Sequence, residues 1–202
     1  MKKEELHPHR YGTRRRRIIT ATIAIIIIAV AAVSLLRTGY RHYMEAAYPL
    51  KYAETVNAMA AEYELPPSLI FAVIRCESGF HEDALSGAGA KGLMQLTDVT
   101  YHWTRKKVGN ALADAPENVF DPAVNIRCGS YLLRYLRNLF GNDETAIAAY
   151  NAGMGRVSGW LKDPAVSADG KHLDSIPYKE TANYVQIVTE ARKIYQQLYA
   201  LE

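Results

Sequence analysis

The stretch PPSLIFAVIRCESGF, residues 66–80, decides the fold. Its two prolines and serine start a helix and Gly79 ends it, because proline suits the first helical turn and glycine the position after the last. An apolar face runs along this helix at spacings of three and four residues, formed by Leu69, Ile70, Val73 and Ile74. Glu77 falls on the same face, so a carboxyl group stands where a hydrophobic residue is expected.

The setting of Glu77 predicts a carboxyl group that keeps its proton near neutral pH. Apolar neighbours disfavour the ionised form, and so does the negative end of the helix dipole, one turn before Gly79. A protonated carboxyl is what a glycosidic oxygen needs from a general acid. Spacing alone leaves a second interpretation open, in which Glu77 lies at the edge of the core and pairs with an arginine or a backbone amide.

The rest of the chain predicts more helices and no strand of any length. The expected helices lie near 50–63, 95–107, 121–140, 142–153 and 178–201. The clearest start is Asp121-Pro122, an N-cap residue followed by a first-turn proline. A loop rich in Gly and Ala covers 80–93. The fold class is therefore mainly α.

Three glycines in the loop, Gly87, Gly89 and Gly92, form a complete G-x-G-x-x-G pattern. A dinucleotide-binding fingerprint needs a strand before these glycines and a helix opening on the third. Here a helix precedes the loop and no βαβ unit surrounds it. The pattern therefore predicts turns or close backbone approach, and no nucleotide cofactor.

The first 36 residues differ from the remainder. Residues 18–36, IITATIAIIIIAVAAVSLL, carry no charge and as a helix would span about 28 Å, the thickness of a bilayer core. Seven basic residues precede this segment, and the bias predicts a cytoplasmic N-terminus with the rest of the chain exported. A cleaved signal peptide is the alternative, since Ala29-Val30-Ala31 offers small residues at cleavage spacing. The expected organisation is a basic tail (1–17), a transmembrane anchor (18–36), a juxtamembrane linker (37–49) that could continue the helix, and a domain (50–202).

The charge of the chain argues against nucleic acid as a partner. The whole sequence has a net charge of +3, but the residues from Ile18 onward hold 17 basic against 19 acidic side chains. Nucleic-acid binding would need a concentrated positive face on the domain. The membrane, through residues 18–36, is the partner that composition predicts.

Four sequence blocks, together with the single residues Ala84 and Ser86, resemble those of lytic transglycosylases of the soluble Slt type. In the order of that family they are ESGF at 77–80, Ala84 with Ser86, GAKGLMQL at 89–96, AYNAG at 149–153 and IPYKETANYV at 176–185. The resemblance covers about 50–199 and implies a lysozyme-like helical fold. It also implies cleavage of the β-1,4 bond between N-acetylmuramic acid and N-acetylglucosamine in peptidoglycan without water, leaving a 1,6-anhydromuramoyl end.

The resemblance assigns roles to seven residues. Glu77 would be the catalytic acid and then the base. The implied substrate-binding residues are Ser86, Met94, Gln95, Tyr150, Asn151 and Glu180. Alternatives stay open for four of these: Met94 as core, Ser86 as a loop hydrogen bond, Asn151 as part of a helix stop, and Glu180 as a first-turn glutamate favoured by the helix dipole. The family often has proline where this chain has Glu82 and Asp98, which puts the detailed shape of the loop in doubt.

Cys76 and Cys128 are the only cysteines, and no pair of histidines has metal-binding helical spacing, so no metal site is expected. A Cys76–Cys128 disulfide is possible in an exported protein, with two separate buried thiols as the alternative. Three other functions stay open: a hydrolase of lysozyme type that uses Asp83 or Asp98, a catalytically dead glycan-binding module, and a structural component of a wall-spanning machine. The sequence identifies no protein partner.

Overall fold

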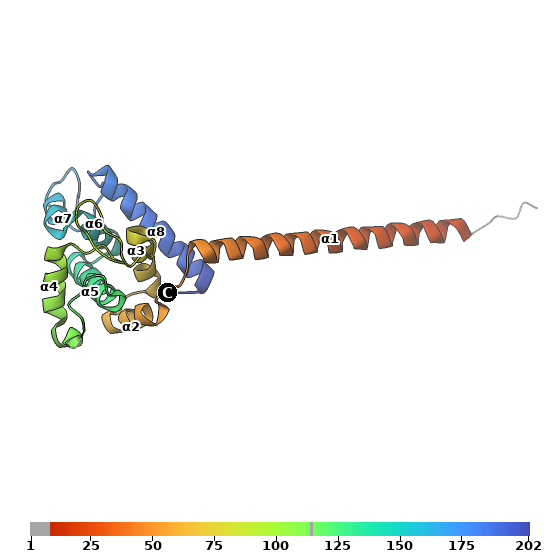
Figure 1. Ribbon diagram of the computed structural model, residues 1–202. Coiled ribbons are helices and arrows are strands. Elements are labelled where there is room, and N and C mark those ends of the chain that lie inside the picture. The colour runs from red at the N-terminus through yellow and green to blue at the C-terminus, as the bar shows by residue number, and fades with distance from the viewer. Residues whose placement is uncertain (1–8, 114) are drawn as a thin grey trace, which may run out of the picture. The chain divides into compact units, whose positions relative to one another are not determined.

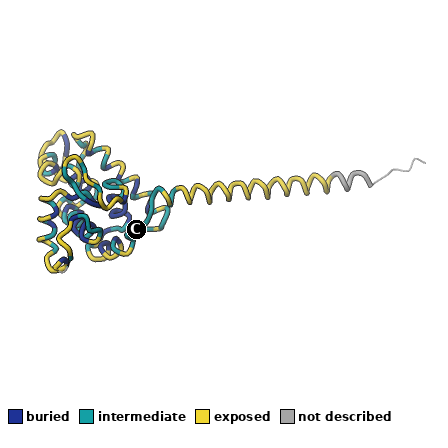
Figure 2. Tube along the Cα trace, viewed as in Figure 1, coloured by how far each residue is buried: buried dark blue, intermediate teal, exposed yellow. Residues whose placement is uncertain are grey.

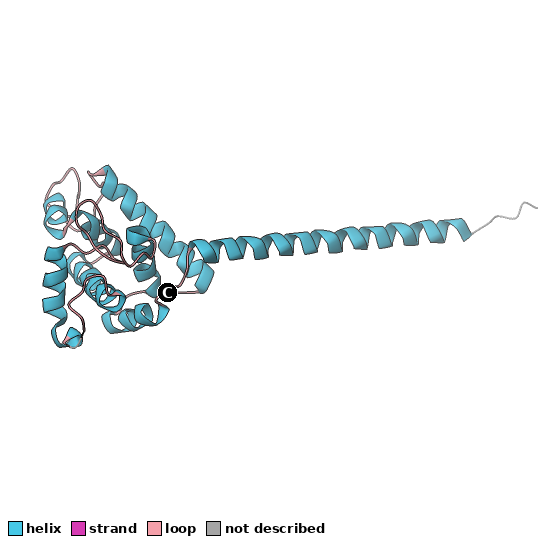
Figure 3. Cartoon of the chain, viewed as in Figure 1, coloured by secondary structure: helices cyan, strands magenta, loops and turns pink. Residues whose placement is uncertain are grey.

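The computed structural model describes residues 9–113 and 115–202, and in these residues every named element is a helix (Figure 1; Figure 3). The chain divides into two compact units, one ending at Ala47 and one running from Tyr48 to Glu202. The mainly α fold class that the sequence predicts is confirmed.

The first unit holds one helix, α1 (His9–Ala47), of 39 residues. Within it, Arg15–Ala47 is long and apolar enough to cross a membrane, and none of its most apolar window is buried. The predicted anchor, 18–36, lies inside this helix, and residues 37–47 of the predicted linker continue it. Residues 1–8 of the predicted tail lie outside the described residues. Isoleucine and leucine side chains are thus exposed along α1, which suits a lipid environment better than water.

The second unit contains the remaining helices. They are α2 (Ala53–Tyr63), α3 (Pro67–Ser78), α4 (Asp98–Val108), the 3₁₀ turn η1 (Gly109–Leu112), α5 (Pro122–Phe140), α6 (Asp143–Ala152), α7 (Met154–Trp160) and α8 (Lys179–Tyr199). Helix α3 packs mainly against α8, while α5 packs against α2, α4 and α6. These contacts place the ends of α3, α6 and α8 around one region of the domain.

Helix α3 is more deeply buried than an amphipathic stripe predicts. All seven residues from Ser68 to Ile74 are buried, including Phe71 and Ala72 outside the predicted face (Figure 2). Helices that are apolar on every side lie in the core rather than at its edge. The catalytic candidate Glu77 therefore sits on a central, tightly packed helix, just where that helix emerges from the core.

The loop between α3 and α4 is compact although it contains no named strand. Lys91 forms antiparallel bridges with Leu85 on one side and Leu96 on the other. Gly92 N donates to Ala84 O at 2.8 Å. The loop is thereby folded back on itself.

The two cysteines are free thiols in this structure, and the possible disulfide stays a question for experiment. Cys76 is half-buried and packs against the large core, which contains most of the buried residues of α3 and α8. Cys128 is buried in a smaller cluster beneath α4, with Leu96, Tyr101 and Val124. Because the side chains belong to different clusters, the alternative of two separate buried thiols describes this arrangement.

We expect titration of the unfolded, unreduced protein to find two thiols per chain. In the folded protein both thiols should react slowly, because burial raises the pKa of Cys76 to about 12 and also raises that of Cys128. The measurement is the rate of labelling with a thiol reagent before and after denaturation. Zero thiols after denaturation would mean that the pair is bridged.

Candidate active site

Glu77 is the next-to-last residue of α3 and is half-buried. Burial raises the pKa of its carboxyl group from 4.5 to about 7, and a hydrogen bond from Tyr184 offsets part of that rise. The Tyr184 hydroxyl donates to Glu77 Oε1 at 2.6 Å. The desolvation argued from the sequence thus acts in the expected direction, and the partner is a phenol instead of an arginine or a backbone amide.

Tyr184 belongs to the block at 176–185 that resembles the family, and the resemblance gave it no individual role. It lies on the inner side of α8, between the buried residues Thr181 and Val185. Burial, followed by the nearby Glu77 charge, raises its pKa well above the usual value, so the phenol stays protonated and remains a donor. The spacing of Thr181, Val185 and Val188 was the signal that could have placed Tyr184 on the inner face.

A cavity of about 280 Å³ opens beside Glu77 and is called here the Glu77 cavity. Its lining residues come from α3, the following loop, α4, α5 and α6, and are Glu77, Ser86, Ala88, Ala90, Gln95, Leu96, Thr97, Thr100, Leu132, Tyr150 and Asn151. Five of the seven residues assigned from the sequence are therefore gathered at one place, although up to 74 positions separate them along the chain.

Ser86 and Gln95 hold the loop while they face the Glu77 cavity. Ser86 Oγ accepts a hydrogen bond from Ala90 N at 3.0 Å, which is the loop bond that the sequence left open as an alternative. Gln95 Nε2 donates to two backbone oxygens, those of Ala84 and Gly92, at 3.1 and 2.9 Å. Its amide nitrogen is thus occupied, and the amide oxygen is the group it can offer to a ligand.

Tyr150 and Asn151 come from the end of α6. The Tyr150 hydroxyl donates to Met94 O at 2.8 Å, which joins α6 to the loop across the Glu77 cavity. Asn151 is exposed, and its Oδ1 accepts a hydrogen bond from Thr181 Oγ1 at 2.8 Å. Both residues are therefore fixed by partners outside α6.

Two assigned residues do not line the Glu77 cavity. Met94 is fully buried and its Sδ and Cβ pack against Gly129, so its side chain belongs to the core. What it contributes is the backbone oxygen that receives the Tyr150 hydroxyl. Glu180 is exposed in the first turn of α8, where the helix dipole favours a carboxylate. Both positions fit the alternatives that the sequence left open, and the assignments of Met94 and Glu180 to substrate binding stay predictions.

Asn125 is a supporting residue that sequence reasoning missed. This fully buried side chain accepts from Met94 N at 2.7 Å through its Oδ1. Its Nδ2 donates to Lys91 O and Val119 O at 3.1 and 2.7 Å. A polar residue inside α5 at an otherwise apolar position was the signal. Asn125 thereby joins Lys91 and Met94 of the loop, and Val119 just before α5, to α5. These bonds support the wall of the Glu77 cavity.

Glu77 is the only carboxylate among the described residues that line this cavity. Asp98, one of the two candidates for a second acid, pairs with Lys91 Nζ at 2.7 Å on the surface. Asp83, the other candidate, is exposed in the loop. Neither residue lines the cavity, so the arrangement offers one acid and no neighbouring carboxylate nucleophile.

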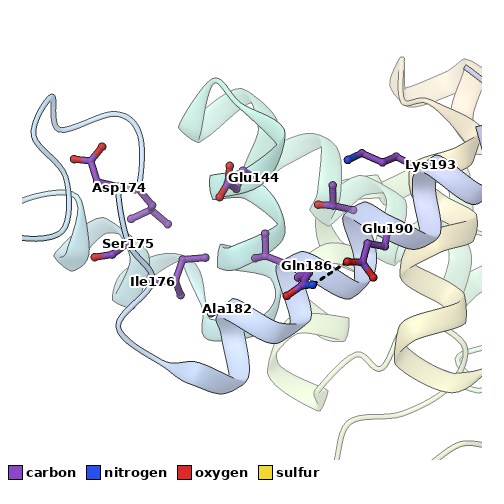
Figure 4. A pocket seen from close by; sticks show the side chains of 11 residues that line it. Glu144, Asp174, Ser175, Ile176, Ala182, Gln186, Glu190 and Lys193 are labelled. Carbon is purple, nitrogen blue, oxygen red and sulfur yellow. Dashed lines mark hydrogen bonds between the residues drawn. The ribbon is translucent and has the colours of Figure 1, made fainter.

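The domain also contains cavities larger than the Glu77 cavity. An apolar cavity of about 420 Å³, with Trp103 and Met154 in its lining, shares Thr100, Leu132 and Tyr150 with the Glu77 cavity and so continues it. Another, of about 430 Å³, lies along α8, where Gln186 donates to Glu190 (Figure 4). That cavity contains none of the seven assigned residues.

The family model described as Transglycosylase SLT domain matches residues 54–172, more than half of the chain. The chain belongs to this family. The soluble lytic murein transglycosylase of Escherichia coli K12 is 36% identical over 148 residues, which are 72% of this chain and 23% of that protein. The membrane-bound lytic murein transglycosylase C of Haemophilus ducreyi is 33% identical over 170 residues, covering 72% of this chain and 45% of its own length.

Solved structures agree with this membership. The chain resembles an inactive glutamate-to-glutamine mutant of lytic transglycosylase Slt from Pseudomonas aeruginosa, with a TM-score of 0.67, 40% identity, and coverage of 76% of this chain and 25% of that one. The 70-kDa soluble lytic transglycosylase of Escherichia coli gives a TM-score of 0.66 at 32% identity, with the same coverage. This chain thus spans about a quarter of these larger proteins. The lysozyme-like, Slt-type fold predicted from the sequence is confirmed.

Proposed function

We propose that the chain is a peptidoglycan lytic transglycosylase that cleaves the bond between N-acetylmuramic acid and N-acetylglucosamine. The observation that carries the proposal is Glu77, a half-buried carboxyl group with a pKa of about 7 that faces the cavity without a second carboxylate in the described lining. An ordinary carboxyl with a pKa of 4.5 is protonated in roughly 1 molecule in 300 at pH 7, so the shift supplies the general acid. The relatives named as lytic murein transglycosylases support the same substrate.

The reaction proceeds in two steps that use one residue. Glu77 donates its proton to the glycosidic oxygen, the bond to the anomeric carbon breaks, and the muramoyl N-acetyl oxygen bonds to that carbon in place of a protein nucleophile. The Glu77 carboxylate then removes the proton of the C6 hydroxyl, whose oxygen attacks the anomeric carbon and releases the N-acetyl group. Glu77 is protonated again, the muramoyl end is a 1,6-anhydro ring, and no water is consumed.

Digestion of purified peptidoglycan sacculi by the full chain in detergent tests the proposal. We expect products that mass spectrometry finds one water lighter than hydrolytic products. Products with only reducing ends would indicate a hydrolase of lysozyme type, with Asp83 or Asp98 as the next acid to test. Binding of sacculi without any cleavage would indicate a glycan-binding module.

We further propose that residues 18–36 anchor the enzyme in the membrane, with the N-terminus in the cytoplasm and the 50–202 domain outside. The apolar helix α1 and the membrane-bound relatives support an anchor. The seven basic residues before Ile18 support the orientation. A secreted form, cleaved near Ala29-Val30-Ala31, is the alternative.

Protease added outside spheroplasts is expected to degrade the domain and to leave a small N-terminal fragment protected. The measurement is immunoblotting with one tag at each end of the chain, and a cytoplasmic protein serves as the control for intact membranes. A domain that survives protease while the spheroplasts are intact would contradict the exported orientation. A domain recovered only from the medium would favour signal cleavage.

Replacement of Tyr184 with phenylalanine is expected to move the alkaline limb of the activity profile to higher pH. The Tyr184 hydroxyl stabilises the ionised carboxylate and lowers the pKa of Glu77, so its loss raises that pKa and keeps the acid protonated in more alkaline solution. The measurement is kcat/KM against pH. The matched control is Tyr195→Phe, a buried tyrosine on the same helix whose hydroxyl donates to Pro49 O instead. An alkaline limb that stays in place in Tyr184→Phe would contradict the assignment.

A further inference from the structure

The side chain of Asn151 can face a ligand in two orientations that differ chemically. Its amide carries an acceptor, Oδ1, at one end and a donor, Nδ2, at the other, and rotation by half a turn exchanges them. Thr181 Oγ1 donates to Oδ1 at 2.8 Å. With the oxygen held by this bond, the nitrogen is the end that Asn151 offers to the Glu77 cavity that it lines.

Thr181 is well placed to hold that orientation. Thr181 is only 2% exposed. It lies in the first turn of α8, and this helix packs against α6. One turn later the same helix presents Tyr184, whose hydroxyl donates to Glu77. Two hydroxyl groups three residues apart on α8 therefore contact two different residues of the Glu77 cavity, one on α6 and one on α3.

We propose that Thr181 is a positioning residue that fixes the Asn151 amide so that an N–H donor faces an acceptor oxygen of the glycan. The inference rests on the proposed function, since it gives Thr181 a role in the binding of an N-acetylated sugar. An N–H donor suits the carbonyl and hydroxyl oxygens of such a sugar. Without the threonine hydroxyl, the amide samples both orientations, and the one with its oxygen toward the acceptor repels the substrate.

A double-mutant cycle in the full chain tests this role. We expect Thr181→Val, which keeps the shape of the side chain and removes the donor, to lower kcat/KM by about tenfold. Thr181→Ser should stay within about twofold of the wild type, because it keeps the hydroxyl. In an Asn151→Ala background, Thr181→Val should cause no further loss, because no amide is left to orient. The alkaline limb should not move in Thr181→Val, since the bond between Tyr184 and Glu77 is intact.

The matched control is Thr189→Val, a half-buried threonine two turns along α8 that lines the other cavity, and its activity should equal that of the wild type. Thermal unfolding of each variant separates misfolding from mispositioning, and Thr181→Ala replaces the valine variant if valine does not fold. Full activity of Thr181→Val, or an equal loss in the Asn151→Ala background, would overturn the inference. A wild-type chain that releases no product from sacculi would overturn the proposed function instead.

Discussion

The Glu77→Gln variant is expected to fold normally and to lose about 10²–10⁴-fold in kcat, or more, because in the proposed mechanism this one residue serves as both acid and base. The amide can neither donate a proton to the leaving oxygen nor accept one from the C6 hydroxyl. Its oxygen can still receive the Tyr184 hydroxyl, so the local packing is kept. The measurement is the rate of release of anhydro-ended products. The matched control is Glu82→Gln. Glu82 is an exposed glutamate in the loop after α3, and its carboxylate accepts a hydrogen bond from the Tyr52 hydroxyl.

Stability against pH gives an independent check on the same variant. The pKa of Glu77 is about 7 in the folded protein against 4.5 for an exposed carboxyl, so the folded state binds more protons between these values. Glu77 therefore makes its full contribution to the free energy of unfolding below about pH 4.5. This contribution is lost as the pH rises through about 7. Urea unfolding should show Glu77→Gln more stable than the wild type above neutral pH, with a smaller difference in acid. Full activity in Glu77→Gln would refute its role as the acid.

Helix positions were predictable where a local signal marks the boundary. Asp121 caps α5 through Val124 N, and Pro122 follows it, as the sequence indicates. The start predicted for α4, near Gln95, was wrong by three residues. Gln95 has a positive φ of 47°, and the cap is Thr97, whose side chain accepts from Thr100 N. Helix α7 was missed because it is short and follows Gly153 with no capping side chain. Local rules therefore located long helices and failed where the loop determines the backbone.

The candidate site was predictable for residues whose own pattern conflicts with their surroundings. Glu77 is such a residue, a carboxyl group on an apolar face. Tyr184 shows no such conflict. Asn125 is a polar residue among apolar ones, but its role, like that of Tyr184, depends on a partner distant in the sequence. The Tyr184 bond spans 107 positions, and the bond from Met94 N to Asn125 spans 31. Only the fold brings these groups together, so sequence reasoning could name the candidate acid but not the residues that support it.

Replacement of Gly92 with alanine is expected to destabilise the domain by about 4 kcal/mol or more and to abolish activity. Gly92 has a φ of +73°, where an L-residue costs about 1–2 kcal/mol. A Cβ would also press on the Asn125 amide and lie 2.9 Å from Val119 O. Movement of Asn125 leaves its three backbone partners without their hydrogen bonds, at about 1–3 kcal/mol for each unsatisfied buried group. The measurement is urea unfolding together with product release.

Gly89→Ala is the matched control, because Gly89 has a similar φ of +80° in the same loop but nothing within 4 Å of an added Cβ. It should lose only the backbone contribution, about 1–2 kcal/mol, and keep most of its activity. Both variants place alanine in the left-handed conformation. The difference between their losses of unfolding free energy therefore measures the crowding against Asn125 alone. Equal losses of stability would mean that the backbone conformation alone requires these glycines. In that case the Asn125 hydrogen bonds would not be what holds the wall of the Glu77 cavity in place.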